Sequence, residues 1–260
     1  MTPSAFTGVG ASHFYELVTH LARRELNSQH RWTLLGWAWP LARQLAQLAV
    51  LVFVFSKLFD LGIDNYAVFV FTGLITFGWF SSGVLGGAYS LLAQRHLVSQ
   101  PRFPASVVPV VAVAVPLVDV LMSLPVLVAM LVGSGSLTLT ALLLPVLLAI
   151  QLVLMCGFAW IFAAAAVYLR DVPQLVLIGV TLLWYMTPVF YSLESVPERY
   201  HWVFDLNPLA TLIEAYRAVL IGDPGPSVLG VAAVSAASVA LAVAGLTMFR
   251  RLEGGFVDEL

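Results

Sequence analysis

The stretch "NPLATLIEAYRAVLIG", residues 207–222, begins and ends like a short helix. Asn207 offers a side-chain cap, and Pro208 stands at the first helical position, where a missing N–H costs nothing. Gly222 follows the last turn, as glycine commonly does at the end of a helix. At a rise of 1.5 Å per residue this helix would be roughly 20 Å long, short of the ~30 Å hydrocarbon core of a bilayer. The stretch predicts a helix that does not cross a membrane.

A second short helix is predicted just before it. Ser195 and Glu198 have the S-x-x-E spacing of a capping box, which indicates a helix from Ser195 to near Asp205. The later helix carries Glu214 and Arg217, which lipid accommodates only at high cost. Such a pair enters a membrane only where protein or a water-filled cavity covers its polar groups. We therefore expect a re-entrant gate pair of helices at the mouth of a conduit.

The rest of the chain has the composition of an all-α integral membrane protein. Of its 260 residues 60% are hydrophobic and 10% are charged, and the mean hydropathy is +0.95. A net charge of −2 gives no indication of a nucleic-acid partner, and the single Cys156 is expected to pack in an apolar run. With about 20 apolar residues per span, we predict six transmembrane helices near residues 36–57, 66–92, 106–132, 138–167, 174–192 and 227–249.

The basic residues set the expected orientation. With both termini in the cytoplasm, nine Arg lie on the cytoplasmic side and three basic residues lie outside, which fits the positive-inside rule. We therefore expect a multi-pass protein of the cytoplasmic (inner) membrane, with the gate pair on the outer side. The cytoplasmic set is Arg23, Arg24, Arg31, Arg43, Arg95, Arg102, Arg170, Arg250 and Arg251, and the outer set is Lys57, Arg199 and Arg217.

The segment 12–31 before the first span is predicted to be an amphipathic helix. Its apolar residues recur at helical spacing, while Arg23, Arg24 and Glu25 lie off that face. We expect it to lie in the cytoplasmic membrane interface; the alternative is a helix packed on a soluble partner. The apolar face consists of Phe14, Leu17, Val18, Leu21 and Ala22.

Four stretches, in order along the chain, carry a family resemblance. The run "LLWYMTPVFYSLESVPERYHWVFDLNPLATLIEAYRAVLIG" (182–222) resembles the last third of polysaccharide-exporting ABC transporter permeases, the membrane subunits that move O-antigens, teichoic acids and related lipid-linked polymers. "LLGWAWPL" (34–41), "PRFPASVVP" (101–109) and "FRRLEGGFVDEL" (249–260) agree with it. The chain departs from the family pattern at Ser99 and Gln100, where a basic residue is common. The resemblance implies one permease domain over residues 1–260, assembled as a homodimer around a conduit.

The sequence carries no motif for an energy source or for catalysis. It has no G-x-x-x-x-G-K-[ST] phosphate loop and no His/Cys/Asp/Glu cluster with metal-ligand spacing. No catalytic, metal or cofactor site is therefore expected in this chain, and the resemblance implies that ATP and Mg bind two separate ATPase subunits. The segment 94–106 would be the coupling segment that docks on them; the alternative is a solvated loop. Its candidate contacts are Arg95, His96, Arg102, Phe103 and Pro104.

Aromatic residues in the second and fifth predicted spans and in the gate pair are candidate conduit residues. A sugar chain presents apolar C–H faces, which aromatic rings hold weakly while Tyr and Trp add a polar group. The alternative is that they anchor helix ends in the membrane interface. The candidates are Trp79, Trp184, Tyr185, Tyr191 and Tyr216.

A lipid-linked glycan of this family carries a pyrophosphate, which favours arginine forks. Arg23, Arg24, Arg31 and Arg43 stand at the predicted cytoplasmic entrance, although Arg43 could instead extend along the apolar surface to the interface. Asp119 is the one acid well inside a predicted span. It is either functional or a hydrogen-bonding partner where prolines disturb the helix.

Three other functions remain as alternatives. A permease of the same fold could export drugs or lipids. An ion-coupled secondary transporter would place ionisable or broken-helix sites in corresponding halves, and Asp119 has no such counterpart. A membrane glycosyltransferase or phosphatase would require paired carboxylates near one membrane face, whereas the predicted outer acids are scattered.

Overall fold

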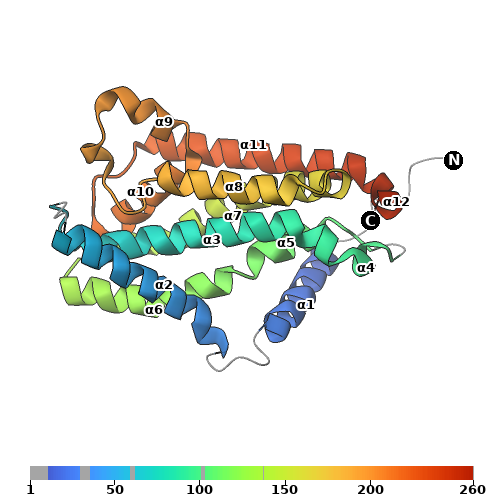
Figure 1. Cartoon of the computed structure of the whole chain (residues 1–260), viewed down its shortest axis with the longest axis horizontal. Helices are drawn as coiled ribbons and strands as arrows, with labels where there is room; N and C mark the ends of the chain where they lie inside the picture. Colours follow the sequence, from blue (N-terminus) through green and yellow to red (C-terminus); the bar gives the residue numbers. More distant parts are fainter. Residues whose placement is uncertain (1–10, 30–35, 59–61, 101–102, 137, 260) are drawn as a thin grey trace.

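The computed structural model describes residues 11–29, 36–58, 62–100, 103–136 and 138–259, and these residues form helices without a strand. The elements follow one another as a bundle whose long helices run side by side (Figure 1). They are α1 (Ala11–Gln29), α2 (Trp39–Val52, continued by a π-helix Phe53–Leu58), α3 (Tyr66–Ala93), α4 (Arg95–Val98), α5 (Val107–Ala114), α6 (Leu117–Ser134), α7 (Leu144–Tyr168), α8 (Val172–Tyr185), α9 (His201–Asp205), α10 (Pro208–Ile221), α11 (Val228–Leu252) and α12 (Phe256–Glu259).

Five stretches of the described chain are long and apolar enough to cross a membrane, which confirms five of the six predicted spans. The predicted span 174–192 is not one helix. α8 covers only 14 residues and ends at Tyr185, because Pro188 disfavours helical geometry at the residue before it. The five stretches are Trp39–Ser56, Tyr66–Ala93, Val107–Ser134, Leu139–Tyr168 and Val228–Glu259.

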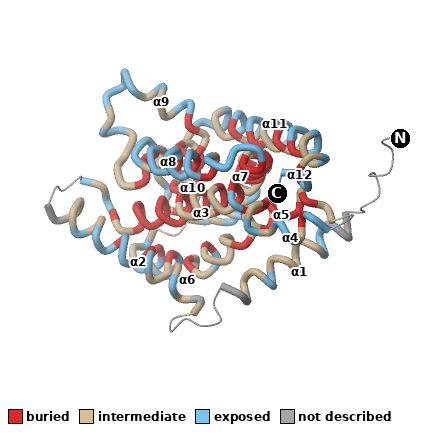
Figure 2. Tube along the Cα trace, turned by 45° about the vertical axis from the view of Figure 1, so that its right-hand side comes forward, coloured by how far each residue is buried: buried red, intermediate tan, exposed pale blue. Residues whose placement is uncertain are grey.

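α3 forms the centre of the bundle. It contacts α2, α5, α6, α7, α8 and α10, while α11 covers the other side of α7. Figure 2 shows the buried positions along the inner helices and the exposed ones on α9. Glycines bring helix backbones together here: a Cβ on Gly157 of α7 would lie 2.9 Å from backbone atoms of Leu241 and Ala242 on α11. Small residues at such crossings are how membrane helices pack closely.

α1 uses its predicted apolar face within the chain. Leu17, Val18, Leu21 and Ala22, joined by Leu26, pack against the buried valines of α5. The predicted apolar face thus packs on the chain's own α5, and the position of the helix in the membrane interface stays a prediction. The side chain of Phe14, and residues 30 and 31 of the predicted helix, lie outside the described part.

Of the two short helices predicted here, the second is present as α10, whereas the first does not begin at Ser195; their role as a gate stays a prediction. α10 begins at Pro208 with the Asn207 side chain accepting from the Leu209 N–H at 3.0 Å, and Gly222 ends it with a φ of 73°. The predicted capping box does not form, because Ser195 ends a three-residue 3-10 turn and its hydroxyl donates to the Ser192 carbonyl. Pro197 holds Val196 in extended geometry, so the next helical turns begin only at Glu198.

α9 lies at one end of the bundle, and α4 and α12 lie at the opposite end (Figure 1). The predicted outer and cytoplasmic segments are therefore separated by the length of the long helices.

Candidate substrate path and coupling end

A cavity of about 400 Å³ opens between α1, the start of α2, α3 and the α5–α6 junction. We call it the entrance cavity. Two predicted pyrophosphate contacts, Arg24 and Arg43, line it together with the acids Glu25 and Asp119. Its other lining residues are mostly apolar: Leu21, Leu26, Leu97, Val108, Val111 and Val115 belong to this set. A cavity with cationic groups and apolar walls fits a ligand that has an anionic head and a hydrocarbon part.

A second cavity of about 370 Å³ adjoins the first. We call it the aromatic cavity, because Trp79, Trp184 and Phe77 line it. The rings of Phe77 and Trp184 meet edge to face with centroids 4.9 Å apart. The two cavities share Arg43, Ser82, Pro116 and Asp119 in their walls. The entrance cavity therefore adjoins an aromatic surface on the same side of α3.

The meeting point of the two cavities is a break between helices. Pro116 lacks an N–H and separates α5 from α6, which places Asp119 in the first turn of α6. Trp79 donates its indole N–H to the Val113 carbonyl at 3.1 Å and so satisfies an acceptor near the break. Ser123 donates to the Asp119 carbonyl at 2.8 Å or to the Gln44 side chain at 2.7 Å. The break is held by side-chain hydrogen bonds.

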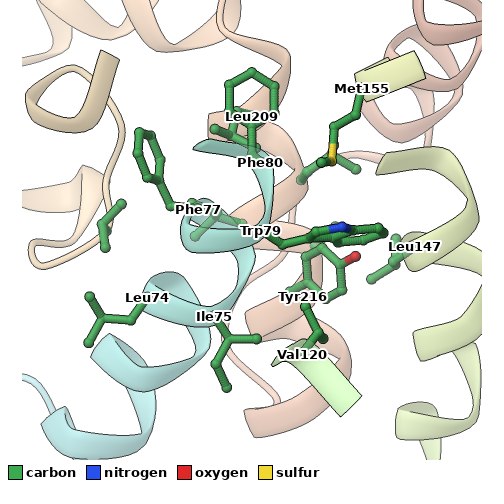
Figure 3. Close-up of a cluster of buried hydrophobic side chains, with 14 of the residues drawn as sticks. Leu74, Ile75, Phe77, Trp79, Phe80, Val120, Leu147, Met155, Leu209 and Tyr216 are labelled. Atoms are coloured by element: carbon green, nitrogen blue, oxygen red, sulfur yellow. The ribbon is translucent and has the colours of Figure 1, made fainter. Parts of the chain in front are cut away.

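The five predicted conduit residues do not share one surface. Trp79 and Trp184 line the aromatic cavity. Tyr216 lies inside the core beside Trp79 (Figure 3) and is 3% exposed. Tyr185 is 64% exposed at the end of α8, and its carbonyl accepts a hydrogen bond of 3.1 Å from the Tyr191 hydroxyl.

The four predicted entrance arginines are likewise divided. Arg24 and Arg43 are exposed and lie on the entrance cavity. Arg23 is exposed but is not among the residues that line it. Arg31 lies outside the described residues.

Arg217 of α10 is the most deeply buried charge among the described residues, at 3% exposure. Its guanidinium donates to the Val189 carbonyl at 2.8 Å and to the Phe69 carbonyl at 3.4 Å, and it lies 3.4 Å from the Phe69 ring centroid. Gly73 permits this approach, since a Cβ there would lie 2.8 Å from the Val189 oxygen. The sequence indicated that Arg217 must be covered, but its carbonyl partners lie 28 and 148 positions away.

Arg217 also lines a third cavity, of about 560 Å³, with Glu194, Glu214 and Asp223. Burial raises the pKa of the Asp223 carboxyl, and the charge of Arg217 opposes that shift. This end of the bundle is polar and acidic. The described residues contain no group of three or more His, Cys, Asp or Glu arranged to hold a metal ion.

In the predicted coupling segment, 94–106, the described residues are 94–100, which include the four-residue helix α4, and 103–106, which lead into α5. Arg95 and His96 are exposed, Phe103 packs on a buried cluster with Phe249 and Phe256, and Pro104 is half-buried. Arg102 lies outside the described residues. The segment thus presents charges at its start and is anchored at its end.

Two residues that the sequence did not single out hold the end of this segment. Glu253 accepts from the Ala105 N–H at 3.2 Å, and Trp160 donates its indole N–H to the Ser106 carbonyl at 3.0 Å. Glu253 belongs to the "FRRLEGGFVDEL" stretch, but its partner is 148 positions away. No local pattern could have paired them.

Comparison with known proteins shows the family of this chain. The model of the ABC-2 type transporter family matches residues 16–221. The chain belongs to this family. The permease is 30% identical over 247 residues to the O-antigen export system permease protein RfbA of Myxococcus xanthus, with 94% of this chain and 95% of the relative covered. It is 26% identical over 253 residues to the protein of the same name from Klebsiella pneumoniae, with 95% and 96% covered.

Family membership also fits the long apolar helices. The permease is a membrane-spanning subunit of an ABC transporter, with homology to O-antigen export permeases over most of its length.

Proposed function

We propose that the permease is the membrane subunit of an ATP-driven exporter that moves a polyprenyl-pyrophosphate-linked cell-surface polysaccharide or teichoic-type polymer across the cytoplasmic membrane. The observation that carries this proposal is the pair of adjoining cavities, one with arginines and apolar walls and one with aromatic walls. The names of the relatives support a polymer rather than a drug as the substrate.

The chemistry of the entrance cavity supports a pyrophosphate-linked lipid. Arg24 and Arg43 offer planar forks that suit phosphate oxygens. The apolar side chains around them suit the first isoprene units. Glu25 and Asp119 would keep the cavity near neutral before a ligand binds, which lowers the cost of arginines near a membrane.

The aromatic cavity suits the sugars that follow the headgroup. Trp184, which is partly exposed, offers ring surface to a sugar's C–H face, and the buried ring of Phe77 packs edge to face against it. Ring contacts are weak and tolerate different orders of sugars, so they allow a polymer to slide. Drug export by the same fold is the nearer alternative, since aromatic walls also bind flat apolar molecules.

The assembly belongs to the proposal as well. α8 would complete six spans by crossing with the turn that follows it, and α10 with the segment 193–206 would form the outer gate. Two copies of the permease would enclose the conduit, and two ATPase subunits carrying ATP and Mg would dock at the exposed start of the coupling segment. The excess of arginine at that end supports cytoplasmic termini in the inner membrane.

The test is co-purification of the permease with its ATPase, followed by ATPase assays in proteoliposomes. We expect a stable complex whose activity rises with a polyprenyl-pyrophosphate-linked glycan and not with a lipophilic drug. Scrambling residues 94–100 should abolish the complex, whereas scrambling the exposed outer residues 198–202 should leave it intact. A folded permease that binds no ATPase, or one stimulated only by the drug, would overturn the proposal.

A further inference from the structure

Two buried oxygen atoms near the middle of the bundle have no hydrogen-bond partner within the described residues: Gln151 Oε1 on α7 and the Tyr216 hydroxyl on α10. Gln151 is 0% exposed and Tyr216 is 3% exposed. Buried polar groups in native proteins are nearly always paired, because leaving one unpaired costs the full price of desolvation. The pair therefore indicates a partner that is not a protein atom.

Both residues line one small cavity of about 20 Å³ between α3, α6, α7 and α10. That volume exceeds the roughly 10–15 Å³ that one water needs and leaves no room for a larger molecule. The remaining walls are chiefly apolar, which disfavours a charged occupant: Ile75, Val120, Leu124, Leu127, Leu144, Leu148 and Leu220 form them.

Two threonines of α3 complete the polar lining. Thr72 donates its hydroxyl to the Val68 carbonyl, and Thr76 donates to the Thr72 carbonyl, both at 2.9 Å. Their hydrogens are committed, but each oxygen keeps lone pairs that accept hydrogen bonds. The cavity thus offers one donor, the Tyr216 hydroxyl, and three acceptor oxygens on Gln151, Thr72 and Thr76.

We propose that this cavity binds a single ordered water that links α10 to α7 and α3. The water accepts from the Tyr216 hydroxyl and donates to Gln151 Oε1 and to a threonine oxygen, while Gln151 Nε2 keeps its 2.9 Å hydrogen bond to the Thr76 carbonyl. Such a water makes the three hydrogen bonds typical of buried sites. If α10 belongs to a gate, a point that rests on the proposed function, the water fixes α10 to the core and leaves the exposed segment 193–206 to move.

A double-mutant cycle on the full-length permease tests the bridge. Tyr216→Phe and Gln151→Leu should each lower the Tm by at least about 2–4 °C, the shift of roughly one hydrogen bond in a chain of this size. The Tm of the double variant should fall by less than the sum of the two single decreases, because either change alone already removes the water. Tyr200→Phe, at an exposed ring, is the matched control and should leave the Tm unchanged. Additive losses would overturn the bridge.

A structure of the unmodified protein at a resolution that shows waters gives an independent test, which also serves if a variant does not fold. We expect one density peak within hydrogen-bonding distance of the Tyr216 hydroxyl and Gln151 Oε1. An empty cavity, a direct contact between the two side chains, or a Tm that changes on exchanging Na⁺ for K⁺ would overturn the water. A confirmed water with unchanged transport in Tyr216→Phe would instead count against the gate role of α10.

Discussion

Arg217 provides a direct test of how the short helix α10 is held in the bundle. α10 has eight buried residues out of 14, and it joins the backbone of α3 and the turn after α8 through one guanidinium. Replacing Arg217 with alanine removes that connection and leaves the Val189 carbonyl buried without its donor. Replacing it with methionine keeps most of the volume but not the hydrogen bonds.

The structure sets the size of the effect. The 2.8 Å hydrogen bond to Val189 involves a charged donor and contributes about 1.5–3 kcal/mol. The contact with the Phe69 ring, at 3.4 Å and away from water, contributes about 2 kcal/mol, whereas the 3.4 Å bond to the Phe69 carbonyl is long and adds little. Removing the buried charge relieves its desolvation penalty, which partly offsets the cost of the cavity that a shorter side chain leaves. Arg217→Ala should therefore lower the free energy of unfolding by roughly 4 kcal/mol, and Arg217→Met by roughly half as much.

Thermal unfolding followed by tryptophan fluorescence measures this difference. At about 2–4 °C per kcal/mol, Arg217→Ala should lower the Tm by roughly 8–16 °C. Arg199→Ala is the matched control: that arginine is exposed and lies 4.7 Å from the Tyr200 ring, so its loss should change the Tm by less than about 2 °C. An Arg217→Ala protein that melts within 2 °C of the unmodified one would refute the reasoning.

Three further changes test the other contacts. Gly73→Ala places a Cβ 2.8 Å from the Val189 carbonyl oxygen, so it should lower the Tm by several degrees through about 1–3 kcal/mol of overpacking. Glu253→Ala removes the acceptor of the Ala105 N–H, which should cost about 1–3 kcal/mol and weaken ATPase binding in co-purification, while Glu253→Gln keeps an acceptor oxygen and most of the binding. Arg43→Gln should raise the concentration of pyrophosphate-linked substrate needed for half-maximal ATPase stimulation by roughly tenfold, since a charged hydrogen bond of about 1.5 kcal/mol is lost.

Each of these changes has a control in the same chain. Gly133→Ala has open space around its Cβ and should not lower the Tm. Glu259→Ala at the exposed end of α12 should leave ATPase binding unchanged. Arg23→Gln removes an exposed charge that lines neither cavity, so an Arg23 variant as impaired as the Arg43 variant would show that general surface charge attracts the substrate.

The sequence predicted the parts of the fold that depend on local chemistry. Long apolar runs predicted five spans, and the Asn-Pro start and the glycine end predicted α10. The prediction failed near two prolines: α8 ends at Tyr185, shortly before Pro188, and Val196 is extended before Pro197. A hydropathy average takes no account of this steric effect of proline. The S-x-x-E spacing of a capping box takes no account of the residues between the serine and the glutamate.

The candidate site was only partly predictable, because its contacts join distant parts of the chain. The sequence indicated arginines near the entrance and aromatic residues in the spans, but helix packing alone decides that Trp79 meets Val113 and that Tyr216 faces Gln151's cavity rather than a surface. Side-chain type suggests what a residue can bind. Its neighbours across the bundle determine whether it reaches a ligand.

The helix break at Pro116 places polar groups within one long apolar stretch of the chain. An unbroken helix would pair every backbone group within itself and would offer a substrate only side chains. The break interrupts the ladder, and the Trp79 indole donates to the Val113 carbonyl just before it. Asp119 therefore stands in a first helical turn, and it lines both cavities together with Arg43. Charges of opposite sign in the same cavity walls lower the cost of placing either one within a membrane.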